Sequence, residues 1–398
     1  MNRTGKFWRT PAAAGRFCVP GKAAGMCALL LCGWMLCACE LNQEYRPIHI
    51  PSVISEVRQK YQPDKRLSVF QVRWGGHGEE YDLKGEVDNP QAKEELLVEL
   101  KKAFPQRRFK DEIVVLPHPD LKGAVWGVVR NSVAGQYQEN RYTSTLVNQG
   151  LMGMELRLLK KWEGWYQVKM PDGYLGWMPG GYFVSGDEEW IRNWKSRPKV
   201  LVDRLFDLIR TRPAADAPSL GDVVRGCRLV RIGEKNGWVE VETPDGQRGF
   251  LESKAILDET ALAAKKPTAQ DLEETARTML GFPYLWGGTS TKGVDCSGFT
   301  FSVFRFNNLV LPRDADMQSQ VGQKVDIQSG IDLLKKGDLL FFGSDSADGI
   351  KITHVGLYLG EGRYIHSSGF VKINSLKEGD PDFNAERRST LRKARRYL

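Results

Sequence analysis

The pattern of apolar and polar positions predicts both strands and helices in the part of the chain before residue 117. Three runs rich in apolar and β-branched residues predict strands over Leu67–Trp74, Tyr81–Val87 and Asp111–Leu116. An amphipathic stretch that begins at Asp88-Asn89-Pro90 predicts a helix before the third strand. Residues 39–116 are therefore expected to form a tether, which leads into a short helix, and a small α+β unit.

An internal repeat follows this unit. Glu163–Trp177 and Asn236–Phe250 each contain a strand pattern, a Pro-Asp-Gly turn and a second strand that ends in an aromatic residue, and the copies start 236 − 163 = 73 residues apart. Proline presets φ in such a turn and glycine accepts a positive φ. Several short strands with inward-facing aromatic residues predict two small barrels, at 117–185 and 198–257, joined by Trp190–Arg197.

The last part of the chain, residues 267–398, follows a linker over Ala261–Pro267 and predicts helices and then strands. One helix is expected over Ala269–Leu280 and ends at Gly281, a second begins at Cys296, and a short third one follows the turn Leu311–Asp314. Three strands are then expected, over Asp338–Phe342, Ile352–Leu359 and Arg363–Ser368.

The amino-terminal sequence adds a prediction about the location of the protein. The first 38 residues hold five cations and no acidic residue, and an apolar run covers residues 23–38. This composition is typical of a secretory signal, and the run is shorter than the ~20 residues that span a membrane. Leu36-Cys37-Ala38-Cys39 resembles a lipobox. It predicts a chain that begins at an acylated Cys39 and is lipid-anchored in the cell envelope; a soluble secreted protein is the alternative.

Charge and cysteine content exclude several other classes of protein. Removing the five cations of the leader changes the net charge from +8 to 8 − 5 = +3, and no basic stripe suited to nucleic acid is present. Beyond the leader remain Cys39, Cys227 and Cys296, without a CxxC pair. A disulfide framework, a zinc site and a cofactor are therefore not expected. Cys227 lies in an apolar run and is expected in the core.

Cys296 stands where a nucleophile would be activated. It opens a predicted helix in Val294-Asp295-Cys296-Ser297-Gly298, after the glycine-rich Trp286-Gly287-Gly288. Free backbone N–H groups at a helix start are expected to stabilise a thiolate and to lower the pKa of the thiol. The same N–H groups can face an oxyanion. A buried, inert cysteine is the alternative, which the polar neighbours disfavour.

Two of the five histidines are candidates for the partners of this thiol. His354 and His366 lie on two predicted strands that Gly360-Glu361-Gly362 would connect as a three-residue hairpin loop. That loop places His354 opposite Ser368 and diagonal to His366 on one face, within reach of two imidazoles. His354 is then the expected base and His366 the residue that orients it.

These motifs, with Phe282–Gly288, Lys336–Phe342 and Thr353–Tyr358, closely resemble the NlpC-type family of cell-wall cysteine peptidases. The resemblance covers residues 267–398 and implies a papain-like fold, in which the helix of the nucleophile packs on an antiparallel sheet. The two barrels resemble bacterial SH3-like domains. The expected fold class is a multidomain α+β protein.

The resemblance also implies a substrate. Members with two SH3-like barrels cleave between γ-D-glutamate and the diamino acid of peptidoglycan stem peptides, and they require a free amino-terminal L-alanine. By resemblance, Tyr284 lines the site and assists the oxyanion, and Asp295, Ser297 and Asp314 bind substrate. Asp295 would pair with the ammonium group. The first barrel would close the cleft, with Tyr174 contributing unless it serves only the turn.

Two other functions stay open at this point. One is a wall-binding lipoprotein whose peptidase fold is inactive, for which an undepressed pKa of the Cys296 thiol would speak. The other is an amidase or acyltransferase on the same fold. The complete Cys, His, His set favours the peptidase, because binding alone would not require all three residues.

Overall fold

The computed structural model describes residues 49–398, except 265, 329 and 348. The predicted signal and the acylated Cys39 lie outside the described residues. Over the described part of the chain, no helix is long and apolar enough to cross a membrane.

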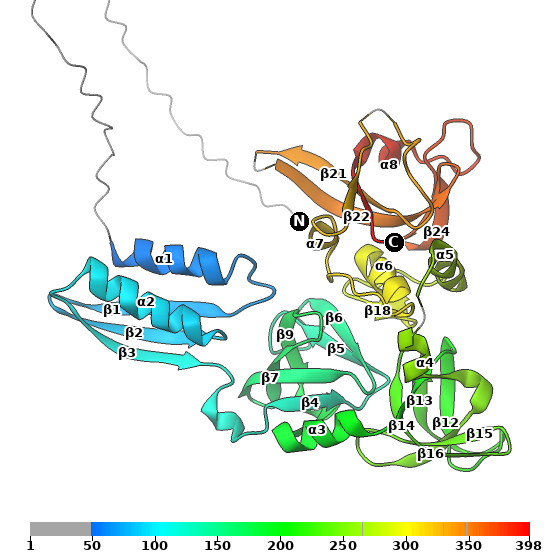
Figure 1. Cartoon of the computed structure of the whole chain (residues 1–398), viewed down its shortest axis with the longest axis horizontal. Coiled ribbons are helices and arrows are strands. Elements are labelled where there is room, and N and C mark those ends of the chain that lie inside the picture. Colours follow the sequence, from blue (N-terminus) through cyan, green and yellow to red (C-terminus); the bar gives the residue numbers. More distant parts are fainter. Residues whose placement is uncertain (1–48, 265, 329, 348) are drawn as a thin grey trace, which may run out of the picture. The chain divides into compact units, whose positions relative to one another are not determined.

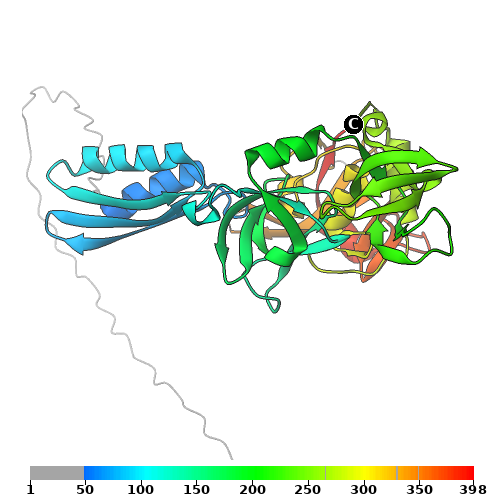
Figure 2. The ribbon, with the colours of Figure 1, turned by 90° about the horizontal axis from the view of Figure 1, so that it is seen from below.

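The amino-terminal unit is a three-stranded sheet with two helices on one face (Figures 1 and 2). Strands β1 and β2 are antiparallel, whereas β2 and β3 are parallel, because α2 crosses over between them. Leu83 of β2 packs with Leu96 and Leu100 of α2, and all three are fully buried. The unit consists of α1 (Ile50–Tyr61), β1 (Phe70–His77), β2 (Glu80–Val87), α2 (Pro90–Ala103) and β3 (Arg108–Val115).

Seven strands form the sheet of the first barrel, in the order β10-β4-β7-β8-β9-β5-β6. The first copy of the repeat forms the β8–β9 hairpin, as predicted, with the Pro-Asp-Gly turn between its strands. The elements are η1 (Pro119–Leu121), β4 (Trp126–Val129), β5 (Val133–Tyr137), β6 (Leu146–Leu151), β7 (Glu155–Trp162), β8 (Trp165–Lys169), β9 (Leu175–Pro179), η2 (Gly180–Tyr182) and β10 (Phe183–Gly186).

The second barrel also has a seven-stranded sheet, in the order β13-β12-β16-β15-β14-β11-β17. The second copy of the repeat forms its β15–β16 hairpin. Helix α3 (Glu188–Ser196) joins the barrels, and α4 (Glu259–Ala264) follows the second. The strands and the short helix are β11 (Lys199–Val202), β12 (Phe206–Arg210), β13 (Ser219–Val224), β14 (Arg228–Lys235), β15 (Trp238–Glu242), β16 (Arg248–Glu252), η3 (Ser253–Ala255) and β17 (Ile256–Asp258).

The carboxy-terminal domain packs α6 on β22 and β23 of a six-stranded sheet, in the order β20-β25-β21-β22-β23-β24. All neighbours in this sheet are antiparallel. The sequence predicted only three of these strands. The helices are α5 (Ala269–Thr278), α6 (Cys296–Arg305), α7 (Ala315–Gln318) and α8 (Ala385–Thr390). The strands are β18 (Thr289–Ser290), β19 (Gly293–Val294), β20 (Gln323–Val325), β21 (Leu339–Ser346), β22 (Gly349–Gly360), β23 (Arg363–Ser368), β24 (Phe370–Ser375) and β25 (Leu391–Arg396).

Candidate active site

Cys296 is the first residue of α6, and Asp295 caps that helix. One carboxylate oxygen of Asp295 accepts a hydrogen bond from the Gly298 N–H at 2.6 Å. A Cβ atom on Gly298 would lie 1.9 Å from the carbonyl oxygen of Gly288, so the helix starts directly against the glycine-rich loop. Helix capping and close packing thus fix the position of the thiol.

The protonation of this thiol differs from the prediction. Burial and the neighbouring Asp295 carboxylate raise the pKa of Cys296 to about 11, although the backbone N–H groups of Val355 and Ser297 act in the opposite direction. The expected depression of the thiol pKa was therefore wrong. The desolvation of a thiolate outweighs the helix start here, so the free protein holds Cys296 as a thiol at neutral pH.

The two histidines lie on the same face of adjacent strands, as predicted, but the hairpin differs. Gly360 pairs with Arg363, so the hairpin loop has two residues instead of three. A β-bulge between Tyr358 and Gly360 adds one unpaired residue, and the strands beyond it therefore pair in the predicted register. His366 then falls opposite Gly356, diagonal to His354. A Cβ atom on Gly356 would lie 3.2 Å from that of His366, so the glycine leaves room for the second imidazole.

A chain of hydrogen bonds fixes the tautomers of both imidazoles. The Asn374 amide donates its Nδ2–H to the Asp382 carbonyl oxygen at 3.0 Å, so its Oδ1, 2.9 Å from His366 Nε2, is an acceptor. His366 therefore carries its proton on Nε2 and accepts at Nδ1 from His354 Nε2–H, at 2.6 Å. Nδ1 of His354 is left with a free lone pair, which makes it the atom that can take a proton.

Burial keeps both rings neutral. It lowers the pKa of His354 well below its usual range, with His366, Arg387 and Lys372 acting in the same direction. Burial also lowers the pKa of His366 to about 4, against the bond to Asn374. A neutral His354 can remove the thiol proton during the attack on a carbonyl. The backbone N–H of Val355, the residue after His354 on β22, acts on the Cys296 thiol and lowers its pKa, which relates the thiol to this part of the strand.

A cleft of about 480 Å³ opens above the thiol. Its lining contains every residue that the sequence predicted to bind substrate, whereas the two histidines are not part of the lining and are 5% and 0% exposed. Burial raises the pKa of the Tyr284 hydroxyl, and the Cys296 sulfur and Asp295 add to this effect, so the phenol remains a donor beside the thiol. The predicted lining residues are Tyr174, Tyr284, Asp295, Cys296, Ser297 and Asp314.

Asp295 has a different partner from the one that the resemblance implied. Both of its oxygens bind the guanidinium of Arg313, at 2.6 and 3.2 Å, and one also accepts from the Gly287 N–H at 2.8 Å. The Arg313 side chain is 1% exposed and donates to Ser297 Oγ at 3.0 Å as well. An ammonium group of a substrate would meet a carboxylate that already has these partners inside the protein, so the predicted Asp295–ammonium pair stays a prediction.

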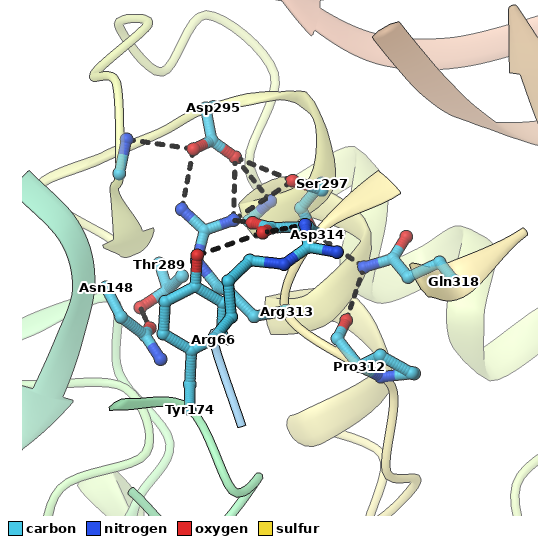
Figure 3. Close-up of polar contacts among 12 residues, drawn as sticks. Arg66, Asn148, Tyr174, Thr289, Asp295, Ser297, Pro312, Arg313, Asp314 and Gln318 are labelled. Carbon is cyan, nitrogen blue, oxygen red and sulfur yellow. Dashed lines mark hydrogen bonds and ion pairs between the residues drawn. The ribbon is translucent and has the colours of Figure 1, made fainter. Parts of the chain in front are cut away.

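Asp314 and Tyr174 meet at another wall of the cleft (Figure 3). The Tyr174 hydroxyl donates to Asp314 Oδ2 at 2.9 Å, although the two residues lie 140 positions apart. Tyr174 therefore reaches the peptidase domain and does more than close its turn. Arg66 also donates to Asp314 Oδ2, at 2.7 Å.

Buried hydrogen bonds also attach the first barrel to the peptidase domain. The N–H of Thr289, on β18, donates to Gln149 Oε1 at 2.9 Å, and the hydroxyl of the same threonine donates to Asn148 Oδ1 at 3.3 Å. These bonds are buried, so they fix the first barrel on the peptidase domain.

Sequence reasoning missed three contributors. Arg313 follows Leu-Pro and precedes Asp314, a turn that gave no sign of a buried guanidinium. Asn374 and Arg66 stand in ordinary polar surroundings, and no signal in the sequence marks them. Among the described residues, no group of histidine, cysteine and acidic side chains could hold a metal ion.

Family models match three parts of the chain. The NlpC/P60 family matches residues 281–383, a bacterial dipeptidyl-peptidase Sh3 domain matches 137–180, and a bacterial SH3 domain matches 208–256. These matches, with the helices and sheets described above, confirm the predicted multidomain α+β fold class. All three matched ranges begin after the amino-terminal unit, which contributes Arg66.

Two curated relatives have the same printed name, γ-D-glutamyl-L-lysine dipeptidyl-peptidase. The one from Bacillus cereus is 33% identical over 56% of this chain and 67% of its own length. The one from Bacillus subtilis is 32% identical over 56% of this chain and 73% of its own length. A crystal structure of an NlpC/P60 family protein from Bacillus cereus is similar with a TM-score of 0.58 and 27% identity, over 69% of this chain and 99% of that one.

A buried thiol on a helix that packs against an antiparallel sheet, together with these relatives, defines a hydrolase of the peptidase class. The chain belongs to the NlpC/P60 family. The resemblance that the sequence motifs carried is thereby confirmed, and the relatives support action on peptidoglycan peptides.

Proposed function

We propose that this chain is a cysteine endopeptidase that hydrolyses the bond between γ-D-glutamate and the diamino acid of stem peptides with a free amino-terminal L-alanine. One observation carries the proposal: a single cleft holds the Cys296 thiol and, on another wall, the carboxylate of Asp314 beside Tyr174. The relatives named for γ-D-glutamyl-L-lysine cleavage support the same bond.

The proposed reaction begins with attack of the Cys296 sulfur on the γ-carbonyl carbon, while His354 Nδ1 takes the thiol proton. The negative charge that develops on the carbonyl oxygen would be stabilised by the Tyr284 phenol and by N–H groups at the start of α6. His354 then returns the proton to the leaving amine of the diamino acid. Water hydrolyses the thioester in the second half of the reaction.

His366 and Asn374 serve this reaction without touching the substrate. His366 accepts the Nε2–H of His354, so the ring keeps Nδ1 free for the thiol. When His354 becomes positive in the transition state, the same hydrogen bond stabilises the charge. Both residues are positioning residues in this scheme.

Recognition of the free amine is assigned to Asp314 rather than to Asp295. Both carboxylates line the cleft and each has an arginine partner. Both oxygens of Asp295 bind Arg313 and its side chain is 9% exposed, whereas Asp314 binds Arg66 through Oδ2 alone and its side chain is 25% exposed. An ammonium group next to a partly exposed carboxylate gains a charge-assisted hydrogen bond. A peptide whose L-alanine is still joined to glycan has no such group.

The test is a digest of L-Ala–γ-D-Glu–L-Lys by the wild type and by Cys296→Ala, followed by mass spectrometry. We expect release of L-Ala–γ-D-Glu by the wild type alone. The amino-terminally acetylated peptide is the matched control and is expected to be cleaved at least tenfold more slowly, since it lacks the charge. A second set of peptides, with another diamino acid in place of L-Lys, tests which diamino acid the enzyme accepts.

Two results would contradict the proposal. Equal cleavage by Cys296→Ala would exclude the nucleophile, and no cleavage by the wild type would favour an inactive wall-binding protein. The raised pKa of the Cys296 thiol is the observation that favours this alternative. Hydrolysis or transfer at a different bond would instead indicate an amidase or acyltransferase.

We further propose that the chain is secreted across the inner membrane and lipid-anchored in the cell envelope through Cys39. The basic leader, its apolar run and the Leu-Cys-Ala-Cys sequence support this proposal. Metabolic labelling with a fatty acid should label the wild type and leave Cys39→Ser unlabelled. Equal labelling of both, or none of either, would contradict it.

A further inference from the structure

Arg66 brings the amino-terminal unit to the substrate cleft. The residue lies between α1 and β1, and its guanidinium binds carboxylates of the peptidase domain (Figure 3). It lies 2.7 Å from Asp314 Oδ2, and 2.9 and 2.7 Å from the two oxygens of Asp316. Both of these aspartates line the cleft. The unit itself lies outside the three ranges that the family models match.

The guanidinium has no N–H left for a ligand. Its Nε and one Nη bind Asp64, and its remaining donors bind Asp314 and Asp316. An arginine has five N–H donors, and all of them have carboxylate acceptors here. Arg66 therefore organises neighbouring carboxylates and does not itself bind a substrate anion.

The hydrogen bonds to Asp314 leave one of its oxygens available. Oδ2 accepts from both Arg66 and the Tyr174 hydroxyl, at 2.7 and 2.9 Å. Within the described part of the chain, Oδ1 accepts no hydrogen bond, and the Arg313 guanidinium lies 3.9 Å from it. The two donors thus fix the orientation of the carboxylate and leave Oδ1 free to accept from a further donor in the cleft.

The cluster also keeps a negative charge. Asp64, Asp314 and Asp316 contribute −3 and Arg66 contributes +1, which leaves −3 + 1 = −2. Without the guanidinium, three carboxylates would lie together and repel each other, so the Asp314 side chain would turn away. With it, the carboxylate keeps one orientation, in which an ammonium ligand can bind it.

The backbone around Arg66 is held by the first barrel. The Leu175 N–H donates to the Arg66 carbonyl oxygen at 2.7 Å, directly after Tyr174. Leu67 packs against the core of that barrel, and Val69 packs with Leu159 and other barrel residues. Two ion pairs, Lys160–Glu86 and Lys169–Asp88, join the same parts of the chain. Arg66 and Tyr174 therefore reach Asp314 from one connected support.

We infer that the amino-terminal unit is part of the substrate site and that Arg66 is a positioning residue, which holds the Asp314 carboxylate for the free amine of the peptide. This inference rests on the proposed function, because it names the residue that supports the amine subsite of that function. It predicts that the unit determines substrate affinity and leaves the chemistry at Cys296 unchanged.

The experiment compares KM and kcat for L-Ala–γ-D-Glu–L-Lys and its acetylated form. Arg66→Ala should raise KM for the free-amine peptide about tenfold and change kcat less than about twofold, since a charge-assisted contact is lost far from the thiol. The preference for the free amine over the acetylated peptide should shrink by the same factor. Arg66→Lys keeps the charge with fewer donors and should give an intermediate KM.

Arg73→Ala is the matched control, because Arg73 is an exposed arginine on β1 of the same unit. It should leave KM and kcat as in the wild type. Should Arg66→Ala fail to fold, as shown by its thermal unfolding, Arg66→Gln replaces it with a neutral side chain of similar length, and the same rise in KM is expected.

Three outcomes separate the possibilities. An unchanged KM in Arg66→Ala would overturn the inference while the proposed function stands. A lower KM or a higher rate of Arg66→Ala on the free-amine peptide would overturn the inference too, because it would show that Arg66 blocks the amine subsite in the wild type. Failure of the wild type to cleave the peptide would overturn the proposed function, and this inference with it.

Discussion

At the scale of single residues, Asn374 decides which atom of the base is available. Its amide oxygen forces the proton of His366 onto Nε2, and His366 Nδ1 in turn accepts a hydrogen bond from His354 Nε2–H. The two histidines could be predicted from the sequence, because a hairpin brings them onto one face. Asn374 could not, because β24 was not predicted and a lone asparagine has many possible partners.

Replacing Asn374 by alanine should lower kcat, since His366 then loses the acceptor that fixes its tautomer. A lost hydrogen bond of about 1 kcal/mol corresponds to roughly a five- to tenfold lower rate. Steady-state kinetics on the free-amine peptide would measure it, and KM is expected to stay within about twofold. A change confined to KM would show that Asn374 does not act through the imidazoles.

At the scale of elements, the junction between the glycine-rich loop and α6 places the thiol. The sequence predicted the helix start at Cys296, and the structure begins α6 at that residue. It did not predict how closely the loop approaches: the Gly288 carbonyl oxygen leaves no room for a Cβ atom at Gly298. Such contacts depend on the path of a second segment, which local patterns do not describe.

Gly298→Ala should therefore destabilise the peptidase domain. The added methyl group would lie 1.9 Å from the Gly288 oxygen and 3.0 Å from Asp295 Oδ1, and overpacking of this kind costs about 1–3 kcal/mol. Gly221→Ala is the control, because nothing lies within 4 Å of a Cβ atom there, and its effect should stay within about 0.5 kcal/mol. Denaturant unfolding measures both; equal stabilities would contradict the argument.

At the scale of the whole molecule, separate parts of the chain build one cleft. Tyr174 comes from the first barrel, Arg66 from the amino-terminal unit, and Asp314 and Cys296 from the peptidase domain. No motif in the sequence of the amino-terminal unit indicates a role in the site. Arg66 becomes relevant only when the chain folds so that this residue meets Asp314, 248 positions further along.

Burial of two neutral imidazoles also makes the stability of the folded chain depend on pH. The pKa of His354 is lowered well below 6.5 and that of His366 to about 4, so between pH 6.5 and 5 the unfolded chain binds more protons than the folded one. Stability should be fully present above pH 6.5 and fall as the pH decreases, by up to about 1.4 kcal/mol per pH unit for each imidazole.

Unfolding by denaturant at pH 7, 6 and 5 would measure this effect. Staying at or above pH 5 limits the contribution of carboxylates. His354→Gln removes one of the two buried imidazoles and should reduce the slope of stability against pH, whatever its effect on stability at pH 7. A slope unchanged by this substitution would show that His354 is not buried as a neutral ring.

The sequence by itself determined the features whose signals are local. These are the repeated hairpins with their Pro-Asp-Gly turns, the helix that begins at Cys296, and the diagonal placement of His354 and His366 on one face of a hairpin. Only the tertiary structure decided the charge states and the partners. Burial raised the pKa of the thiol, Arg313 took the carboxylate of Asp295, and Arg66 reached Asp314. Periodicity and turns act over a few residues, whereas desolvation and ion pairing depend on every segment that packs around a group.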